Sequence, residues 1–113
     1  MMYEYKCKVL NVVDGDTVDC EIDLGFFIKK TERIRLRGID TPELNSKDPV
    51  ERGSAGMAKS RVQELAPHVT LIKTHLDKSD KYGRLLGILF IEDDPVSVND
   101  KLVTEGLAVP YMV

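Results

Sequence analysis

A side-chain period of two residues governs the start of the chain and restricts it to β-structure. Between residues 3 and 9, and again between residues 18 and 24, apolar side chains alternate with charged ones. This pattern is typical of strands with one buried face. Asp14-Gly15 stands between the two segments, and because glycine tolerates positive φ the dipeptide strongly indicates a hairpin turn. The N-terminal region is therefore predicted to be an antiparallel hairpin.

The rest of the chain adds three strands and two helices to this hairpin. We predict strands at about residues 31–39, 69–76 and 84–91, and helices at about 54–66 and 97–106. In the first helix, Ser54 is expected to be the N-cap and Pro67 to mark the stop, while residues 45–53 are interpreted as a loop. The helix has an apolar stripe at helical spacing, formed by Ala55, Ala58, Val62 and Leu65. Ser97 and Gly106 are expected to bound the second helix.

The order of three strands, helix, two strands and helix predicts an α+β, β-rich fold. We expect a five-stranded OB-fold barrel with two packed helices, and the alternative is an open antiparallel sheet with both helices on one face. The 113 residues suffice for one domain and not two, so residues 1–113 are expected to form a single domain. We expect a monomer.

Targeting features point to a soluble chain. No apolar run approaches the ~20 residues needed to span a membrane. Charged residues stand near the N-terminus, where a signal peptide would need an apolar segment. As written, the sequence therefore predicts a cytoplasmic protein with no membrane partner.

The net charge and the cysteine and histidine content exclude few classes of function. The net charge of -3 argues weakly against a nucleic-acid partner, yet a cleft can be locally basic, and carboxylates that bind metal lower the count. Cys7 and Cys20 are too few for a disulfide scaffold and match no zinc spacing, so both are interpreted as buried or half-buried thiols on strands. His68 and His75 are expected to be surface or edge residues.

Three short segments could carry chemistry. Asp14-Gly15-Asp16-Thr17 places two acids around a turn glycine, and Asp40-Thr41-Pro42-Glu43 follows a strand that carries Arg35. Carboxylates bind hard cations, and arginine binds phosphate with two parallel hydrogen bonds, so this mixture suits a metal-bridged phosphate ester. The third segment, residues 80–84, combines a charged loop with glycine, tyrosine and arginine. Taken alone, each segment could be an ordinary solvated turn or loop. For Asp14-Gly15-Asp16-Thr17 alone that interpretation is favoured, and residues 80–84 alone are only a weak signal.

Taken together, the order and spacing of these motifs resemble the staphylococcal nuclease (thermonuclease) family. The similarity covers about residues 8–111 and includes Val98-Asn99 and residues 105–108 near the end. It implies an OB-fold barrel and a calcium-dependent endonuclease acting on DNA and RNA, with magnesium or manganese as possible replacements for calcium. The family's best-known members continue into another C-terminal helix beyond the position of Tyr111, so one wall of the nucleotide pocket is expected to differ.

The resemblance also implies a role for each matching residue. The metal ligands would be the carboxylates of Asp16 and Asp40 and the carbonyl of Thr41. The catalytic residues would be Glu43, as general base beside the attacking water, with Arg35 and Arg84 binding the phosphate. The adjacent nucleotide would contact Lys81, Tyr82 and Tyr111. The competing hypothesis is a catalytically silent OB-fold module that binds nucleic acid or a protein.

Overall fold

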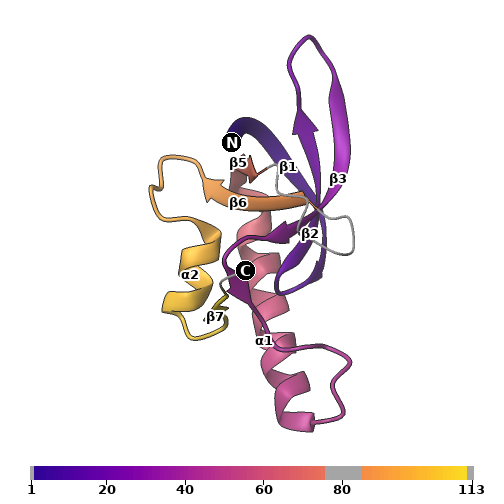
Figure 1. Ribbon diagram of the computed structural model, residues 1–113, viewed down its shortest axis with the longest axis vertical. Coiled ribbons are helices and arrows are strands. Elements are labelled where there is room, and N and C mark those ends of the chain that lie inside the picture. The colour runs from indigo at the N-terminus through magenta and orange to yellow at the C-terminus, as the bar shows by residue number, and fades with distance from the viewer. Residues whose placement is uncertain (1, 76–84, 112–113) are drawn as a thin grey trace.

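Five strands close into a barrel in the computed structural model, which describes residues 2–75 and 85–111. The barrel order is β1 (Met2–Asp14), β2 (Thr17–Asp23), β3 (Lys29–Leu36), β6 (Leu85–Ile91) and β5 (Val69–His75) (Figure 1). Neighbouring strands are antiparallel except β3 and β6, which run parallel. The predicted α+β, β-rich OB-type barrel is thereby confirmed, and the open-sheet alternative is wrong.

Two helices and a small second sheet complete the described part of the chain. These are α1 (Pro49–Leu65), continued by the 3-10 turn η1 (Ala66–His68), α2 (Val98–Thr104), and the antiparallel pair β4 (Ile39–Asp40) and β7 (Val109–Pro110). In Figure 1 the β2–β3 hairpin and the N-terminal half of α1 project from opposite ends of the molecule. No helix among the described residues is both long and apolar enough to cross a membrane.

Helix α1 begins five residues earlier than predicted. The side chain of Asp48 accepts a hydrogen bond from the Val50 N–H (3.0 Å), so Asp48 and not Ser54 is the N-cap. Pro49 was interpreted as part of a loop, but it occupies the first helical position, where its missing N–H has no partner to lose. The predicted stripe is confirmed, because the buried residues of α1 are Ala55, Ala58, Val62 and Leu65.

The other boundaries differ less from the prediction. Strand β1 extends to Asp14, whereas β3 ends at Leu36; Gly38 has φ of 81° and turns the chain into β4. In α2 the Ser97 hydroxyl accepts a hydrogen bond from the Asp100 N–H (3.0 Å), which confirms the predicted cap. Both cysteines are free and lie on strands, one buried and one half-buried, as expected.

The core lies inside the barrel and beneath both helices. Its fully buried side chains include Val18, Ile34, Leu36, Val62, Ile72, Leu89 and Leu102. Barrel closure brings β6 close to the residues on β3 and β5. A Cβ on Gly87 would lie 2.8 Å from Cγ2 of Ile34 and 2.9 Å from Cδ1 of Ile72. Any larger residue at position 87 would therefore force these side chains or the strands apart.

Candidate active site

Arg35 on β3 joins two carboxylates that are distant in sequence. Its Nη1 lies 3.0 Å from Oδ2 of Asp16, and its Nη2 lies 3.4 Å from Oδ1 of Asp40. The side chains of Arg35 and Asp16 are each 13% exposed, whereas that of Asp40 is 52% exposed. The site therefore has a sheltered ion pair at its base and a second carboxylate open to solvent.

The Asp16 carboxylate is oriented from several directions. Oδ1 accepts a hydrogen bond from the Thr17 hydroxyl (3.1 Å), and Oδ2 faces the N–H of Thr41 at 3.4 Å. The Asp16 carbonyl accepts a short hydrogen bond from the Leu36 N–H (2.7 Å). This backbone bond ties the β1–β2 turn to the end of β3, next to Arg35. The position of the carboxylate is thus set by two strands and by the segment that follows β4.

Gly15 lets this turn pack directly on α1. A Cβ at this position would lie 2.8 Å from the Cβ of Ala58 and 3.1 Å from both Cγ2 and Oγ1 of Thr41. Real side chains do not approach so closely, so only glycine fits here without displacement of its neighbours. The sequence predicted a turn glycine with positive φ, but Gly15 does not have a positive φ. The close packing against Ala58 and Thr41 is what requires glycine here.

The side chains of Asp14 and Asp16 shift each other's pKa in opposite directions. Burial and then the hydrogen bond between their side chains raise the pKa of Asp14 to about 6. Burial also acts to raise the pKa of Asp16, but the hydrogen bond from Asp14 and the charge of Arg35 outweigh it and lower that pKa below its ordinary value. Asp16 is therefore the acid of the pair that stays ionised at the lower pH. Sequence reasoning noted Asp14 only as a turn acid and missed this coupling.

Glu43 lies on an exposed loop that is tied to the first turn of α1. Its N–H faces Oε1 of Glu51 at 3.4 Å, and its carbonyl accepts a hydrogen bond from the Ser46 N–H (3.3 Å). The Ser46 hydroxyl in turn donates to Oε2 of Glu51 (2.6 Å). In the part of the chain that the structure describes, no hydrogen bond joins the Glu43 carboxylate to Asp16, Arg35 or Asp40. The loop-anchoring role of Glu51 was not visible in the sequence.

Tyr111 lies against Arg35. Its N–H donates to the Gly38 carbonyl (2.8 Å), and the Arg35 Cζ lies 6.0 Å from the centre of its ring, within cation–π range. Tyr111 is 47% exposed, so the ring presents an accessible apolar surface beside the guanidinium. The other residues predicted to contact phosphate or nucleotide, Lys81, Tyr82 and Arg84, lie outside the described residues.

Asn99 was named in the sequence only as part of the C-terminal similarity, and the structure shows that it supports the site. Its Nδ2 donates to the carbonyls of Arg37 (2.9 Å) and Gly87 (3.1 Å), and its Oδ1 accepts from the Leu89 N–H (3.2 Å). The residue is buried on α2 next to Val98. A lone amide within an apolar helix face was the available clue. Asn99 fixes the chain where it leaves β3 for Asp40.

The donors available for a metal ion are oxygens. No three His, Cys, Asp or Glu side chains in the described segments are close enough to hold an ion by themselves. Hard divalent ions such as Mg²⁺ need only one or two carboxylates, because water and substrate phosphate complete the shell. The carboxylates of Asp16 and Asp40 contact Arg35, and the Thr41 carbonyl is predicted to lie beside them. These oxygens fit a hard divalent ion better than an ion that prefers nitrogen or sulfur ligands.

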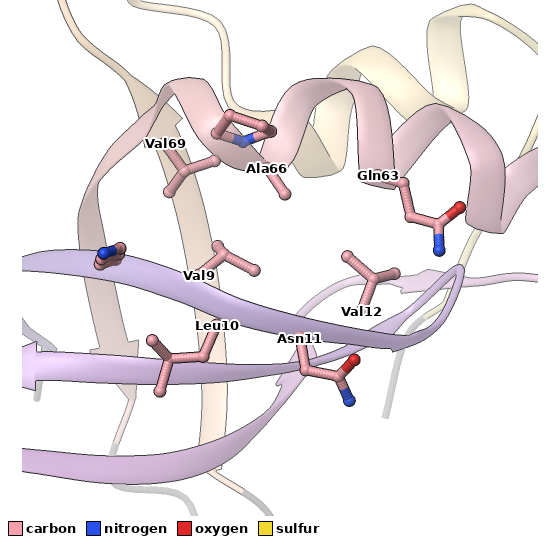
Figure 2. Close-up of a pocket in the computed structure, with 9 residues that line it drawn as sticks. Val9, Leu10, Asn11, Val12, Gln63, Ala66 and Val69 are labelled. Atoms are coloured by element: carbon pink, nitrogen blue, oxygen red, sulfur yellow. The ribbon is translucent and has the colours of Figure 1, made fainter.

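A separate cavity lies between β1 and the end of α1 (Figure 2). It has a volume of about 440 Å³ and is lined mainly by apolar side chains, among them Val9, Val12, Ala66 and Val69. Lys8 is its one charged lining residue. It shares no residue with the Arg35 cluster, so this cavity does not bear on the chemistry proposed for the cluster.

Comparison with known proteins supplies independent information. Residues 33–113 match the family model described as Staphylococcal nuclease homologue. The chain is 33% identical to a thermonuclease of Staphylococcus intermedius over 101 aligned residues. The alignment covers 88% of this chain and 56% of that protein. It is 32% identical over 108 residues to Endonuclease YncB of Bacillus subtilis, and this alignment covers 89% of this chain and 48% of that protein. It is also 30% identical over 117 residues to Protein ParB of Escherichia coli, with coverage of 96% and 58%. The chain thus spans about half to three-fifths of the length of these relatives.

Proposed function

The chain belongs to the staphylococcal nuclease homologue family, and from this premise we propose that it is a divalent-metal-dependent nuclease that hydrolyses phosphodiester bonds. The observation that carries the proposal is the contact of Arg35 with both Asp16 and Asp40. A phosphodiester needs a cationic donor for its oxygens and anionic ligands for a metal. Arg35 is such a donor, and the two carboxylates that it contacts are such ligands.

Each residue of the cluster has a proposed task. Asp16, Asp40 and the Thr41 carbonyl would hold the cation. When bound, such an ion polarises a phosphate oxygen and lowers the pKa of an adjacent water. Asp16 is suited to this task because Arg35 and the hydrogen bonds around it keep it ionised. The open Asp40 carboxylate lies where substrate oxygens can approach.

Arg35 and Glu43 would act on the substrate itself. The guanidinium of Arg35 would donate to the non-bridging phosphate oxygens and stabilise the charge that grows on them during attack. Glu43 would accept a hydrogen bond from the attacking water, orient it and take its proton. We propose that orientation of the water is the larger part of its work. Arg84 is proposed as the second phosphate-binding arginine.

The substrate is proposed to be DNA, RNA or both, with calcium as the cation and magnesium or manganese as substitutes. Tyr111 would stack on the nucleotide next to the cleaved bond, because its exposed ring lies beside Arg35. Lys81 and Tyr82 are proposed to contact the same nucleotide. We also propose that residues 1–113 work as one domain and as a monomer.

Cleavage of labelled single-stranded DNA and RNA by the parent chain and by Glu43→Gln tests this function. We expect cutting with calcium, none with a chelator, and a loss of about 10²–10³-fold in Glu43→Gln, comparable to removal of one well-placed active-site group. Glu4→Gln, an exposed carboxylate on β1 outside the site, serves as the matched control and should retain full activity.

Binding measured by fluorescence anisotropy separates the two candidate functions. A nuclease variant that has lost only its base should still bind the oligonucleotide. If the folded parent binds DNA but cuts neither substrate with calcium, magnesium or manganese, the chain is a binding module and the catalytic proposal is wrong. If Glu43→Gln cuts as fast as the parent, the base is assigned to the wrong residue.

A further inference from the structure

The apex of the β2–β3 hairpin is an apolar cap that is exposed in the described part of the chain. We define the cap as residues 24–28. Phe26 is 93% exposed and Phe27 104% exposed, and both neighbours with large apolar side chains, Leu24 and Ile28, are also exposed (42% and 56%). Figure 1 shows the hairpin projecting beyond the barrel, away from the N-terminal half of α1. Neither ring packs on the core, so folding does not explain them.

The backbone of the cap favours different residues from those present. The Ile28 N–H donates to the Gly25 carbonyl (2.9 Å) and the Leu24 N–H to the Ile28 carbonyl (2.8 Å), which closes a two-residue turn. Its central residues, Phe26 and Phe27, have φ of 54° and 63°. Turns with positive φ at both central positions strongly prefer Asn-Gly, and bulky residues are disfavoured there. Two phenylalanines are therefore held outward in a conformation that is unfavourable for them.

The charges below the cap are balanced. Asp23 and Lys29 are opposite each other in the β2–β3 ladder, so the polar surface resumes at the same level on both strands. Nζ of Lys29 lies 3.7 Å from Oε1 of Glu21, and Nζ of Lys30 lies 2.8 Å from Oε1 of Glu32. Each lysine next to the cap thus has a carboxylate partner. A polyanion such as nucleic acid would meet no unopposed positive charge on this stem.

We propose that the cap inserts into the interfacial layer of a lipid bilayer and holds the protein at a membrane surface. Exposed apolar side chains surround the apex. The polar surface begins at Asp23 on β2 and at Lys29 on β3, which lie opposite each other and so at the same distance from the apex. A planar, fluid apolar phase matches this shape better than a preformed pocket does, because it can surround all the side chains at once. With a rise of about 3.3 Å per strand residue, the cap reaches roughly the 5–10 Å depth of interfacial insertion.

Membrane insertion of the cap would not depend on nuclease activity. The expectation of no membrane partner rested on the absence of a spanning segment, and surface insertion needs only a short apolar cap. Balanced charges on the stem imply that insertion is driven by apolar contact. Binding should therefore occur on zwitterionic phosphatidylcholine vesicles and should persist in high salt.

A tryptophan placed in the cap reports insertion directly. The chain has no tryptophan, so Phe27→Trp introduces a single fluorophore. Its emission should shift to the blue on addition of phosphatidylcholine vesicles and be quenched by brominated acyl chains. The loss-of-function variant is Phe26→Asn with Phe27→Gly. Because the turn prefers these residues, the double variant should fold at least as stably as the parent, yet its vesicle partitioning should fall by about tenfold or more.

Met57→Gln is the matched control, since Met57 is 64% exposed on α1 and lies outside the cap; its partitioning should equal that of the parent. An unshifted emission of Phe27→Trp, or equal partitioning of the double variant and the parent, would overturn the proposal. Partitioning that requires anionic lipid and disappears in high salt would overturn it as well. So would sedimentation data in which the double variant loses self-association while neither protein binds vesicles, because the cap would then serve a protein contact.

Discussion

Alanine at position 15 would insert a methyl group where the structure has no room for one. Its Cβ would lie 2.8 Å from the Cβ of Ala58 and 3.1 Å from two atoms of Thr41. None of these atoms ends a long flexible side chain, so relief requires the turn to move away from α1. Insertion of an extra methyl into a packed region typically destabilises by about 1–3 kcal/mol. For a chain of this length we expect a decrease of roughly 4–12 °C in the melting temperature.

Urea denaturation of four proteins tests this reasoning: the parent, Gly15→Ala, Ala58→Gly and the double variant. Ala58→Gly removes the closest methyl and should itself destabilise α1 by about 1 kcal/mol. Gly15→Ala should then be less destabilising in the Ala58→Gly background than in the parent. Gly56→Ala is the control, because a Cβ there meets nothing within 4 Å and should be neutral or stabilising. Equal destabilisation by Gly15→Ala in both backgrounds would refute the proposed steric contact.

Three further predictions concern Arg35, Asn99 and the ion pair between Arg61 of α1 and Glu105. Arg35→Lys should slow cleavage by about 10²–10³-fold with the fold intact by circular dichroism, because an ammonium cannot reproduce the planar fork that reaches two carboxylates. Asn99→Ala should lower the free energy of unfolding by about 1–3 kcal/mol in urea, since it removes the buried hydrogen bonds that Asn99 makes to the Leu89 N–H and to the carbonyls of Arg37 and Gly87. The hydrogen bond from Arg61 lowers the pKa of Glu105 in the folded state. Its stabilisation is therefore present above the ordinary glutamate pKa and is lost as pH falls through the lowered value; unfolding of the parent and Glu105→Gln in urea should differ at pH 7 and converge in acid.

Patterns that depend on near neighbours in the chain were predicted well. The spacing of Ala55, Ala58, Val62 and Leu65 identified the buried face of α1, and Ser97 was recognised as a cap. The start of α1 was missed because Pro49 is compatible both with a loop and with a first helical turn. The side chain of Asp48 decides between them through its hydrogen bond to the Val50 N–H, and residue type alone does not reveal that bond.

The candidate site shows the same division. The family resemblance predicted that Asp16, Arg35 and Asp40 belong to one site, and the structure brings these three together. The coupling of Asp14 to Asp16 could not be predicted, because a pKa depends on burial and on the distance between two charges. The proposed roles of these residues, and of Glu43 and Thr41, are still predictions.

By itself the sequence determined the five barrel strands, the two helices and their apolar faces, because side-chain period and turn preference are local properties of the chain. Its resemblance to the staphylococcal nuclease family supplied the roles of the candidate functional residues. Only the tertiary structure decided that the sheet closes, that Gly87 and Gly15 stand where backbones approach, and that Arg35 lies between two carboxylates. It also decided that Phe26 and Phe27 point outward, away from the core. These outcomes depend on distances between segments far apart in sequence, and such distances are set by packing of the whole barrel.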